Sequence, residues 1–335
     1  MKHIQKHRHL LIAEIGSVHD GSFGNAKKLI ELAATCGADA VKFQTHIAEA
    51  ETIVNAPAPS YFKDEPRSDY FKRTSFNKEQ WAELKQTADD AGIIFLSSPF
   101  SLEAVELLES IGMEVYKIPS GEVTNIPLLE KIATLGKPVF LSSGMSNWIE
   151  LDEAVDIFRG QCDLTVMQCS STYPCPPNQV GLNVIAEISQ RYRCNVGFSD
   201  HTLGIAAPIA AAALGATIIE KHFTFSKYMY GSDAQHSMEP NEFRLLSAAL
   251  REIWEIQANP VNKNSSESYS EMKDIFQKSI VAAVPIKRGT ILEMKHLAFK
   301  KPGTGIPASS YRELVGKQMI RDCKPDEIIK MEWLA

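Results

Sequence analysis

The sequence predicts a (β/α)8 TIM barrel followed by a small, mostly β domain. From residue 10 onward, short runs rich in Val, Ile and Phe alternate with longer segments of helical periodicity, which is typical of consecutive βα units. Eight such runs precede residue 224, and this number fits a closed barrel better than an open sheet. Periodicity is a local property, so an open doubly wound sheet is compatible with the same pattern.

Each predicted strand is followed by a helix-compatible stretch, such as 25–36, 77–91 and 205–214. Strands of a barrel are buried on both faces and therefore read as nearly continuous apolar runs. We expect the strands at 10–16, 40–45, 93–99, 115–120, 138–144, 164–170, 195–200 and 217–223.

Two interruptions of the βα pattern divide the chain. The stretch 46–76 contains Pro57, Pro59, Pro66 and several aromatic residues, and a long loop of this kind is usually a lid or a binding segment. Near residue 257 the composition changes to Asn, Ser and Pro, which is typical of a linker. We therefore expect a catalytic barrel at 1–257, a linker at 258–271 and a small second domain at 272–335.

Composition favours small-molecule chemistry. The 335 residues are 44% hydrophobic, enough for one full core and a small second domain, and the net charge of −6 argues against a nucleic-acid partner. The apolar run after the basic residues 1–9 is interrupted by Glu14, so we expect neither a signal peptide nor a membrane partner. Six cysteines without a CxxC pair indicate a reducing, cytoplasmic setting.

Polar side chains collect at the carboxyl ends of the predicted strands, where barrel enzymes place their catalytic groups. A polar group in a strand buried on both faces is costly unless it is satisfied, so this many at one rim predict a shared site. They are Glu14, Lys42, Gln44, Ser97, Ser98, Lys117, Ser120, Glu122, Ser142, Ser143, Ser170, Ser171, Tyr173, Ser199, Asp200, His201, Glu220, Lys221 and His222.

Two of these groups indicate specific ligands. Lys42 and Lys117, with the surrounding hydroxyls, predict a pocket for a phosphate or a carboxylate, although each lysine alone could equally form a structural ion pair. His201 and His222 end consecutive strands and predict a divalent metal site with open positions for water and substrate. Mn, Zn, Co and Mg all remain open as the metal.

The carboxylates and thiols near this rim have less specific signals. Glu14, Glu122, Glu220 and Asp233 can each serve as acid, base, hydroxyl partner or orienting group, and spacing does not assign them. Cys169 and Cys175 are interpreted as small buried thiols rather than nucleophiles.

Ordered motifs along nearly the whole chain resemble the N-acetylneuraminate (sialic acid) synthase family. The motifs are AEIGSVHDG at 13–21, VKFQT at 41–45, LSSPF at 96–100, KIPSGE at 117–122, LSSGM at 141–145, YP at 173–174, GFSDHT at 197–202, EKHFT at 220–224, GSDAQHSMEP at 231–240 and KKPGTGI at 300–306. The last resembles the family's antifreeze-protein-like (SAF) domain.

This resemblance implies a reaction and a set of roles. In the family, C3 of phosphoenolpyruvate attacks the aldehyde of an open-chain amino sugar such as N-acetylmannosamine, water adds to C2, and phosphate leaves by C–O cleavage. The resemblance assigns phosphoenolpyruvate to Lys42, Lys117, Ser120, Ser142 and Ser199, and the rim hydroxyls of Ser98 and Ser171 complete that predicted pocket.

The remaining roles follow from the same resemblance. His201 and His222 match the metal-binding histidines, which usually hold Mn, and Glu122 matches a carboxylate implicated in proton movement. Glu14 is expected to act beside Glu122, while Glu14, Gln44, Tyr173 and Asp233 match positions at the acceptor sugar. The resemblance also implies a homodimer in which the last domain caps the partner's barrel.

Four positions depart from the family pattern and leave the acceptor open. Val18, Ser171 and Ala234 stand where asparagine, asparagine and histidine are common. Lys301 stands where an arginine commonly reaches the sugar's N-acyl group, and lysine lacks that planar donor fork. Alternative acceptors are a 2,4-diacetamido sugar leading to legionaminic or pseudaminic acid, an unacylated hexose and a 6-phosphorylated sugar.

Two other classes of function remain open. A Schiff-base aldolase would use Lys42, Lys117 or Lys221 as its nucleophile. A barrel without catalytic activity would only bind a sugar, or another surface through its last domain.

Overall fold

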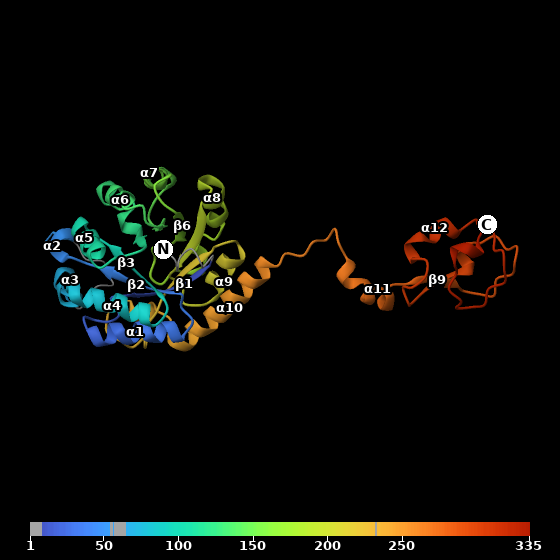
Figure 1. Cartoon of the computed structure of the whole chain (residues 1–335), viewed down its shortest axis with the longest axis horizontal. Helices are drawn as coiled ribbons and strands as arrows, with labels where there is room; N and C mark the ends of the chain where they lie inside the picture. The colour runs from blue at the N-terminus through green and yellow to red at the C-terminus, as the bar shows by residue number, and fades with distance from the viewer. Residues whose placement is uncertain (1–8, 54–55, 57–64, 232) are drawn as a thin grey trace. The chain divides into compact units, whose positions relative to one another are not determined.

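The computed structural model describes residues 9–53, 56, 65–231 and 233–335, and these form two compact units that divide between Asn259 and Pro260. The first unit is a closed barrel in which β1 to β8 follow one another in sequence order and all pair in parallel, with helices around the outside (Figure 1). This confirms the predicted TIM barrel, and closure by the pairing of β1 with β8 excludes the open sheet.

The strand positions follow the predicted apolar runs closely. Three strands have the predicted bounds, and the other five are shorter by one to three residues at one or both ends. The strands are β1 Leu10–Gly16, β2 Ala40–Thr45, β3 Ile94–Pro99, β4 Tyr116–Ile118, β5 Val139–Ser142, β6 Leu164–Cys169, β7 Asn195–Asp200 and β8 Ile218–His222.

The helices begin at side-chain caps that the sequence supplies. Asn77 and Asn147 each cap a helix and form a reciprocal capping box with Gln80 and Glu150. The helices of this unit are α1 Phe23–Thr35, α2 Ala48–Glu51, α3 Arg67–Thr74, α4 Lys78–Asp90, α5 Leu102–Ser110, α6 Ile126–Ala133, α7 Trp148–Phe158, α8 Asn183–Tyr192, α9 Ala206–Ala213 and α10 Pro240–Ala258.

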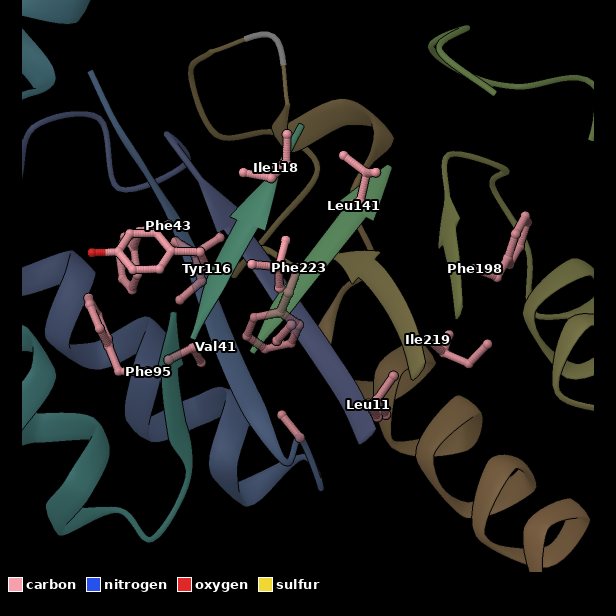
Figure 2. Packing of buried hydrophobic residues seen from close by; sticks show 14 of the residues in the cluster. Leu11, Val41, Phe43, Phe95, Tyr116, Ile118, Leu141, Phe198, Ile219 and Phe223 are labelled. Carbon is pink, nitrogen blue, oxygen red and sulfur yellow. The ribbon is translucent and has the colours of Figure 1, made fainter. Parts of the chain in front are cut away.

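Side-chain alternation along the strands separates two apolar layers. Val41, Phe43, Tyr116 and Leu141 belong to the large core that also includes buried residues of the helices (Figure 2). A separate cluster contains Ile12 and the residues that share its strand face, and we place it inside the barrel. Its members are Leu10, Ile12, Ala40, Leu96, Val115, Phe140, Met167 and Ile218.

The inner face of the strands changes from apolar to polar along their length. On β1 the residue two positions after Ile12 is Glu14, and on β2 the residue two positions after Ala40 is Lys42. Glu14 pairs in register with Lys42 on one side and with His222 on the other. The barrel interior therefore has an apolar layer toward the amino ends of the strands and a polar layer toward their carboxyl ends.

The insertion 46–76 contains α2 and α3, and its prolines Pro57 and Pro59 lie outside the described residues. Tyr70 and Phe71 of α3 pack with Ala48 of α2 in a small buried cluster. No helix among residues 9–53, 56, 65–231 and 233–335 combines the length and apolarity that a bilayer crossing needs.

The second unit has a core of its own around Ile280, Leu292 and Ile329. Its two-stranded antiparallel sheet pairs β9 Ser279–Ala282 with β10 Leu297–Lys300, and single bridges extend the pairing. Two helices, α11 Ser270–Phe276 and α12 Tyr311–Leu314, accompany the sheet. This confirms the small domain with β pairing that the turn-rich C-terminal sequence predicts.

Candidate active site

Two lysines and two glutamates form the floor of the site inside the barrel. Lys42 Nζ lies 2.8 Å from Glu14 Oε2 and 3.6 Å from Glu220 Oε1. Lys117 Nζ lies 3.6 Å from the same Glu220 oxygen. None of the four residues is more than 5% exposed. We call these four residues the charged floor; its two ammonium groups and two carboxylates balance one another.

Burial and mutual attraction set the pKa values of the charged floor. Burial alone would lower the pKa of Lys42, but Glu14 and Glu220 raise it above its ordinary value. Burial lowers the pKa of Lys117. Burial also opposes ionisation of Glu220, yet the two lysines hold the pKa of that carboxyl below its usual range. Burial raises the pKa of Glu14. Repulsion from Glu220, with which Glu14 shares the Lys42 ammonium group, raises it further.

Predicted hydroxyls surround the charged floor. Lys117 Nζ donates to Ser142 Oγ at 2.5 Å, and Lys42 Nζ approaches Ser98 Oγ at 3.4 Å. Ser199 Oγ donates to Glu220 Oε1 at 3.1 Å. The ammonium groups and hydroxyl donors of the predicted anion pocket, on β2, β3, β4, β5 and β7, therefore lie together around the barrel.

Gly144 creates the space in which two further predicted serines meet. The backbone N–H of Gly144 donates to Ser120 Oγ at 3.1 Å. A Cβ atom added at Gly144 would lie 2.4 Å from Ser171 Oγ, 2.5 Å from Ser120 Oγ and 3.0 Å from Cys169 Sγ. Only glycine therefore lets these groups converge. Cys169 and Cys175 are both buried, and Cys169 Sγ lies 3.9 Å from His201 Nδ1.

The two predicted metal histidines face each other across the end of β7 and β8, with ring centroids 5.6 Å apart. His201 Nδ1 lies 2.8 Å from the carbonyl oxygen of Ser170 and therefore donates to it, so Nε2 carries the lone pair of the neutral ring. Burial alone would lower the pKa of His201, but Cys169 and the Ser170 carbonyl raise it above its ordinary value. His222 Nδ1 is buried and has no hydrogen-bond partner in the part of the chain that the structure describes. Burial lowers the pKa of His222 to about 4, so its ring is neutral.

These properties fit a divalent metal ion. A neutral imidazole with an unused buried nitrogen is the form in which histidine binds metals. Across the described ranges, no three or more His, Cys, Asp or Glu side chains gather as a metal site. His201 and His222 would hold such an ion, and its remaining positions would be open to oxygen ligands.

A cavity of about 290 Å³ opens above this region. His222, Ser120 and Ser171 line it, so one of the two predicted metal histidines and the serine pocket share one space. The other lining residues are Ser17, Gln44, His46, Arg67, Tyr70, Phe71, Phe100, Pro119, Gly121, Met145, Tyr173, Asp233 and His236.

Three of the residues predicted at the acceptor sugar, Gln44, Tyr173 and Asp233, lie on the wall of this cavity. Gln44 Nε2 donates to Glu14 Oε1 at 2.8 Å, and the Tyr173 ring lies 4.0 Å from the His201 ring. Gln44, Glu14 and Asp233 converge on Gly16, where a Cβ atom would lie 2.7 Å from Asp233 Oδ2. Gly16 also has a φ of +52°, so glycine is required there for backbone conformation as well as for space.

Other predicted residues lie away from the cavity. Glu122 is in a 3₁₀ turn after β4, where its Oε2 accepts from Asn125 Nδ2 at 2.7 Å, and burial raises its pKa. Asp200 and Lys221 pair with each other at 2.5 Å rather than with the charged floor. Lys301 belongs to the second unit, where its ammonium lies 4.8 Å from the centre of the Phe276 ring.

Sequence reasoning missed several cavity residues from the insertion 46–76 and the loop after β3. They are His46, Arg67, Tyr70, Phe71 and Phe100. Arg67 is the single lysine or arginine among the described lining residues, and its guanidinium lies 5.1 Å from the Phe71 ring centre. Among these, His46 and Phe100 gave a signal in the sequence, because each directly follows a strand, β2 or β3.

Comparisons with known proteins agree with this geometry. Residues 29–262 match the NeuB family and residues 277–334 match the SAF domain. The N,N'-diacetyllegionaminic acid synthase of Campylobacter jejuni is 40% identical over 330 residues, which cover 96% of this chain and 98% of the relative. The human N-acetylneuraminate-9-phosphate synthase is 33% identical over 335 residues, which cover 98% and 93%.

A solved structure shows the same fold and relationship. The N-acetylneuraminic acid synthetase of Leptospira borgpetersenii, crystallised with citrate, is 31% identical and superposes with a TM-score of 0.70. The superposition covers 79% of this chain and 90% of that chain. The chain therefore belongs to the NeuB family of sialic acid and other nonulosonic acid synthases, with a SAF domain as its second unit.

Proposed function

We propose that the protein joins phosphoenolpyruvate to the aldehyde of an N-acylated amino sugar and releases phosphate. The observation that carries this proposal is the pair Lys42 and Lys117, buried together with Ser98, Ser142 and the two glutamates of the charged floor. Two buried ammonium groups ringed by hydroxyls suit a ligand with both a carboxylate and a phosphate. The names of the relatives support a nonulosonic acid as the product.

The proposed chemistry is a condensation in which the enzyme holds two reactants together. C3 of the enolpyruvate forms a bond to the aldehyde carbon, and positive charge develops at C2. Water adds at C2, and the bond between C2 and the phosphate oxygen then breaks to leave the 2-keto acid and phosphate. Lys42 and Lys117 bind the anionic groups, and their burial keeps bulk water from them. Placing the reactants together supplies part of the rate gain, and stabilisation of the developing charge supplies another part.

His201 and His222 would hold a divalent metal, with Mn2+ as the proposed ion. When bound, the metal supplies a Lewis acid for a carbonyl oxygen. The neutral His222 ring and the His201 tautomer fixed by Ser170 support this role. The measurement is phosphate release after dialysis against a chelator: activity should disappear and return with Mn2+. Full activity in metal-free protein would exclude the metal.

Two acceptors remain candidates within this reaction. The sequence resemblance favours N-acetylmannosamine, whereas the 40% identity with a diacetyllegionaminic acid synthase favours a 2,4-diacetamido sugar. Both carry an acyl carbonyl and a methyl group, which the Arg67 guanidinium and the apolar wall of Phe71, Phe100 and Met145 can accommodate. We assign this wall, together with Gln44, Tyr173 and Asp233, to the acceptor.

A panel of aldoses tests the assignment. Phosphate release from phosphoenolpyruvate is measured with N-acetylmannosamine, its 6-phosphate, a 2,4-diacetamido sugar and unacylated mannose. We expect release only when an acylated sugar and the metal are both present. Equal release without any sugar would contradict the synthase proposal. Borohydride with pyruvate should leave no stable lysine adduct, whereas an adduct would support a Schiff-base aldolase.

We also propose a homodimer in which each SAF domain completes the partner's site. Helix α11 of the second unit exposes Met272, Ile275 and Phe276, an apolar surface that a second copy of this chain would cover. In such an assembly Lys301 would act on the partner's acceptor. The six free cysteines support a reducing, cytoplasmic setting for the enzyme.

A further inference from the structure

His46 is clamped between two aromatic rings at the edge of the cavity. Its ring stacks on Phe71 of α3, with centroids 3.7 Å apart and planes 13° from parallel. On the other face it stacks on Phe100, which follows β3, with centroids 4.1 Å apart and planes at 20°. The residue itself is only 7% exposed. The imidazole therefore has no freedom to tilt, and only its edges are available for polar contacts.

Both ring nitrogens of His46 meet acceptors. Nδ1 lies 2.9 Å from each carboxylate oxygen of Glu51, and Nε2 lies 3.1 Å from Gln44 Oε1. The amide nitrogen of Gln44 donates to Glu14, so its oxygen must accept from His46. Nε2 therefore carries a hydrogen, and Nδ1 faces the Glu51 carboxylate. Burial lowers the pKa of His46, and the contact with Glu51 opposes that effect.

These contacts form one continuous chain from the insertion to the charged floor. Glu51 holds His46, His46 donates to Gln44, and Gln44 donates to Glu14. Glu14 in turn pairs with Lys42 at 2.8 Å. An amide group can turn over with little change in shape, so Gln44 needs one fixed partner to define which end faces Glu14. The Nε2–H group of His46 is that partner.

We propose that His46 is a positioning residue, which fixes the orientation of the Gln44 amide and so orders the acceptor wall of the cavity. Gln44 lines the cavity, and Glu51 with the two phenylalanine rings keeps His46 in place. The inference rests on the proposed function, because the effect on catalysis requires an acceptor at this wall. A purely structural role, in which His46 only fills the space between Phe71 and Phe100, is the competing explanation.

The substitution His46→Phe separates the two explanations. Phenylalanine keeps a flat ring between Phe71 and Phe100 but removes both ring nitrogens. We expect the KM for the acceptor to rise about tenfold, the effect of one lost hydrogen bond at a binding wall. The KM for phosphoenolpyruvate should stay within twofold, because the charged floor does not contact His46. An unchanged acceptor KM would contradict the proposal.

A double substitution tests whether His46 acts through Gln44. In a Gln44→Ala background, His46→Phe should have no further effect on acceptor KM, because the group that it positions is absent. Additive effects of the two substitutions would show that His46 acts by another route. Glu51→Gln should weaken acceptor binding in the same direction as His46→Phe. Glu49→Gln is its matched control, since Glu49 lies on the same short helix but pairs with Lys72 at the surface.

A measurement that needs no turnover keeps this inference separate from the proposed function. In ¹H–¹⁵N spectra, the side-chain amide of Gln44, assigned by its loss in Gln44→Ala, should give one sharp pair of signals. In His46→Phe the pair should broaden or split, and unchanged signals would contradict the inference. If the wild-type protein releases phosphate with no aldose while these signals respond as expected, the proposed function fails and the positioning role stands.

Discussion

Lys221 Nζ lies 2.5 Å from Asp200 Oδ2, and both side chains are almost completely buried. The same ammonium group also donates to the backbone carbonyl of Thr202. Burial lowers the pKa of Lys221, whereas Asp200 raises it, and the balance is a lowered pKa. Lys221 follows directly after Glu220 on β8, yet it points away from the charged floor and links two strands instead. Of the three strand-end lysines, Lys42 and Lys117 therefore belong to the charged floor, and Lys221 forms a structural ion pair with Asp200.

Replacing Lys221 should affect stability, and replacing Lys117 should affect ligand binding. Lys221→Met leaves the Asp200 carboxylate buried without its partner, which costs about 3–5 kcal/mol of unfolding free energy. Lys117→Met should abolish detectable phosphoenolpyruvate binding. Urea unfolding and calorimetric titration measure the two effects. Loss of phosphoenolpyruvate binding in a folded Lys221→Met protein would place that lysine in the pocket.

Gly144→Ala should disrupt the serine pocket. The added methyl group would lie 2.4–2.5 Å from the hydroxyl oxygens of Ser171 and Ser120, so one of them must move. We expect the affinity for phosphoenolpyruvate to fall at least tenfold while metal binding is retained. Gly160→Ala tests for a general effect of the added methyl group, since a Cβ atom there meets nothing within 4 Å, although its φ of +74° brings some backbone strain. Wild-type affinity in Gly144→Ala would show that the serines do not hold the ligand.

Arg67→Met should weaken acceptor binding without affecting phosphoenolpyruvate. Arg67 is the cationic residue of the cavity wall, and loss of a hydrogen bond from a charged donor should raise the acceptor KM about tenfold or more. Lys72→Met removes a positive charge from the same helix at an exposed site and serves as the control. Equal KM values for the two variants would remove Arg67 from the acceptor site.

His19 should make the protein less stable in mild acid. Its Nδ1 accepts the backbone N–H of Gly21 at 3.1 Å, and burial lowers its pKa to about 4 from an ordinary value of 6.5. Between these two values the unfolded chain binds more protons, so stability rises with pH from about 4 to 6.5. The contribution is about 3 kcal/mol.

The variant His19→Asn keeps an acceptor for Gly21 but cannot titrate. Urea midpoints of metal-free protein, measured between pH 4.5 and 7, should depend less steeply on pH in this variant. An equally steep dependence in both proteins would mean that His19 is protonated in the folded state or that other groups dominate.

A truncated chain of residues 1–262 should separate the two halves of the site. The barrel unit ends at Asn259 and has a core of its own, so it should fold and bind phosphoenolpyruvate. Sugar-dependent phosphate release should be lost if the SAF domain completes the partner's site. Light scattering should show a dimer for the full chain. Full turnover by the truncated protein would assign the SAF domain a passive role.

The strands were predictable because a buried parallel strand leaves a continuous apolar run in the sequence. Strand β4 is shorter than predicted because Pro119 has no N–H group for a ladder hydrogen bond, and the chain turns into the 3₁₀ segment Ser120–Glu122. Closure of the barrel was not predictable from periodicity alone, since the pairing of Leu10 with Ile218 joins the first strand to the last.

The sequence predicted which residues belong to the site better than it predicted which of them contact one another. Lys42, Lys117 and the serines were expected at one rim because they occupy strand ends, and the structure brings them together. That Glu220 lies between the two lysines depends on the stagger of β2, β4 and β8, which the sequence does not encode locally. His46, Glu51 and Phe100 meet only through tertiary packing, so no local sequence pattern predicted the contacts among them.

Because its charges balance, the charged floor should favour a ligand with two anionic groups over a small monoanion. Lys42 and Lys117 already face Glu14 and Glu220, so a small monoanion gains attraction from one ammonium group and meets repulsion from a neighbouring carboxylate. A ligand with two separate anionic groups can engage both lysines at once, and it can bring a divalent cation that offsets its own charge. Chloride and acetate, abundant in any cell, would be poor competitors at such a floor.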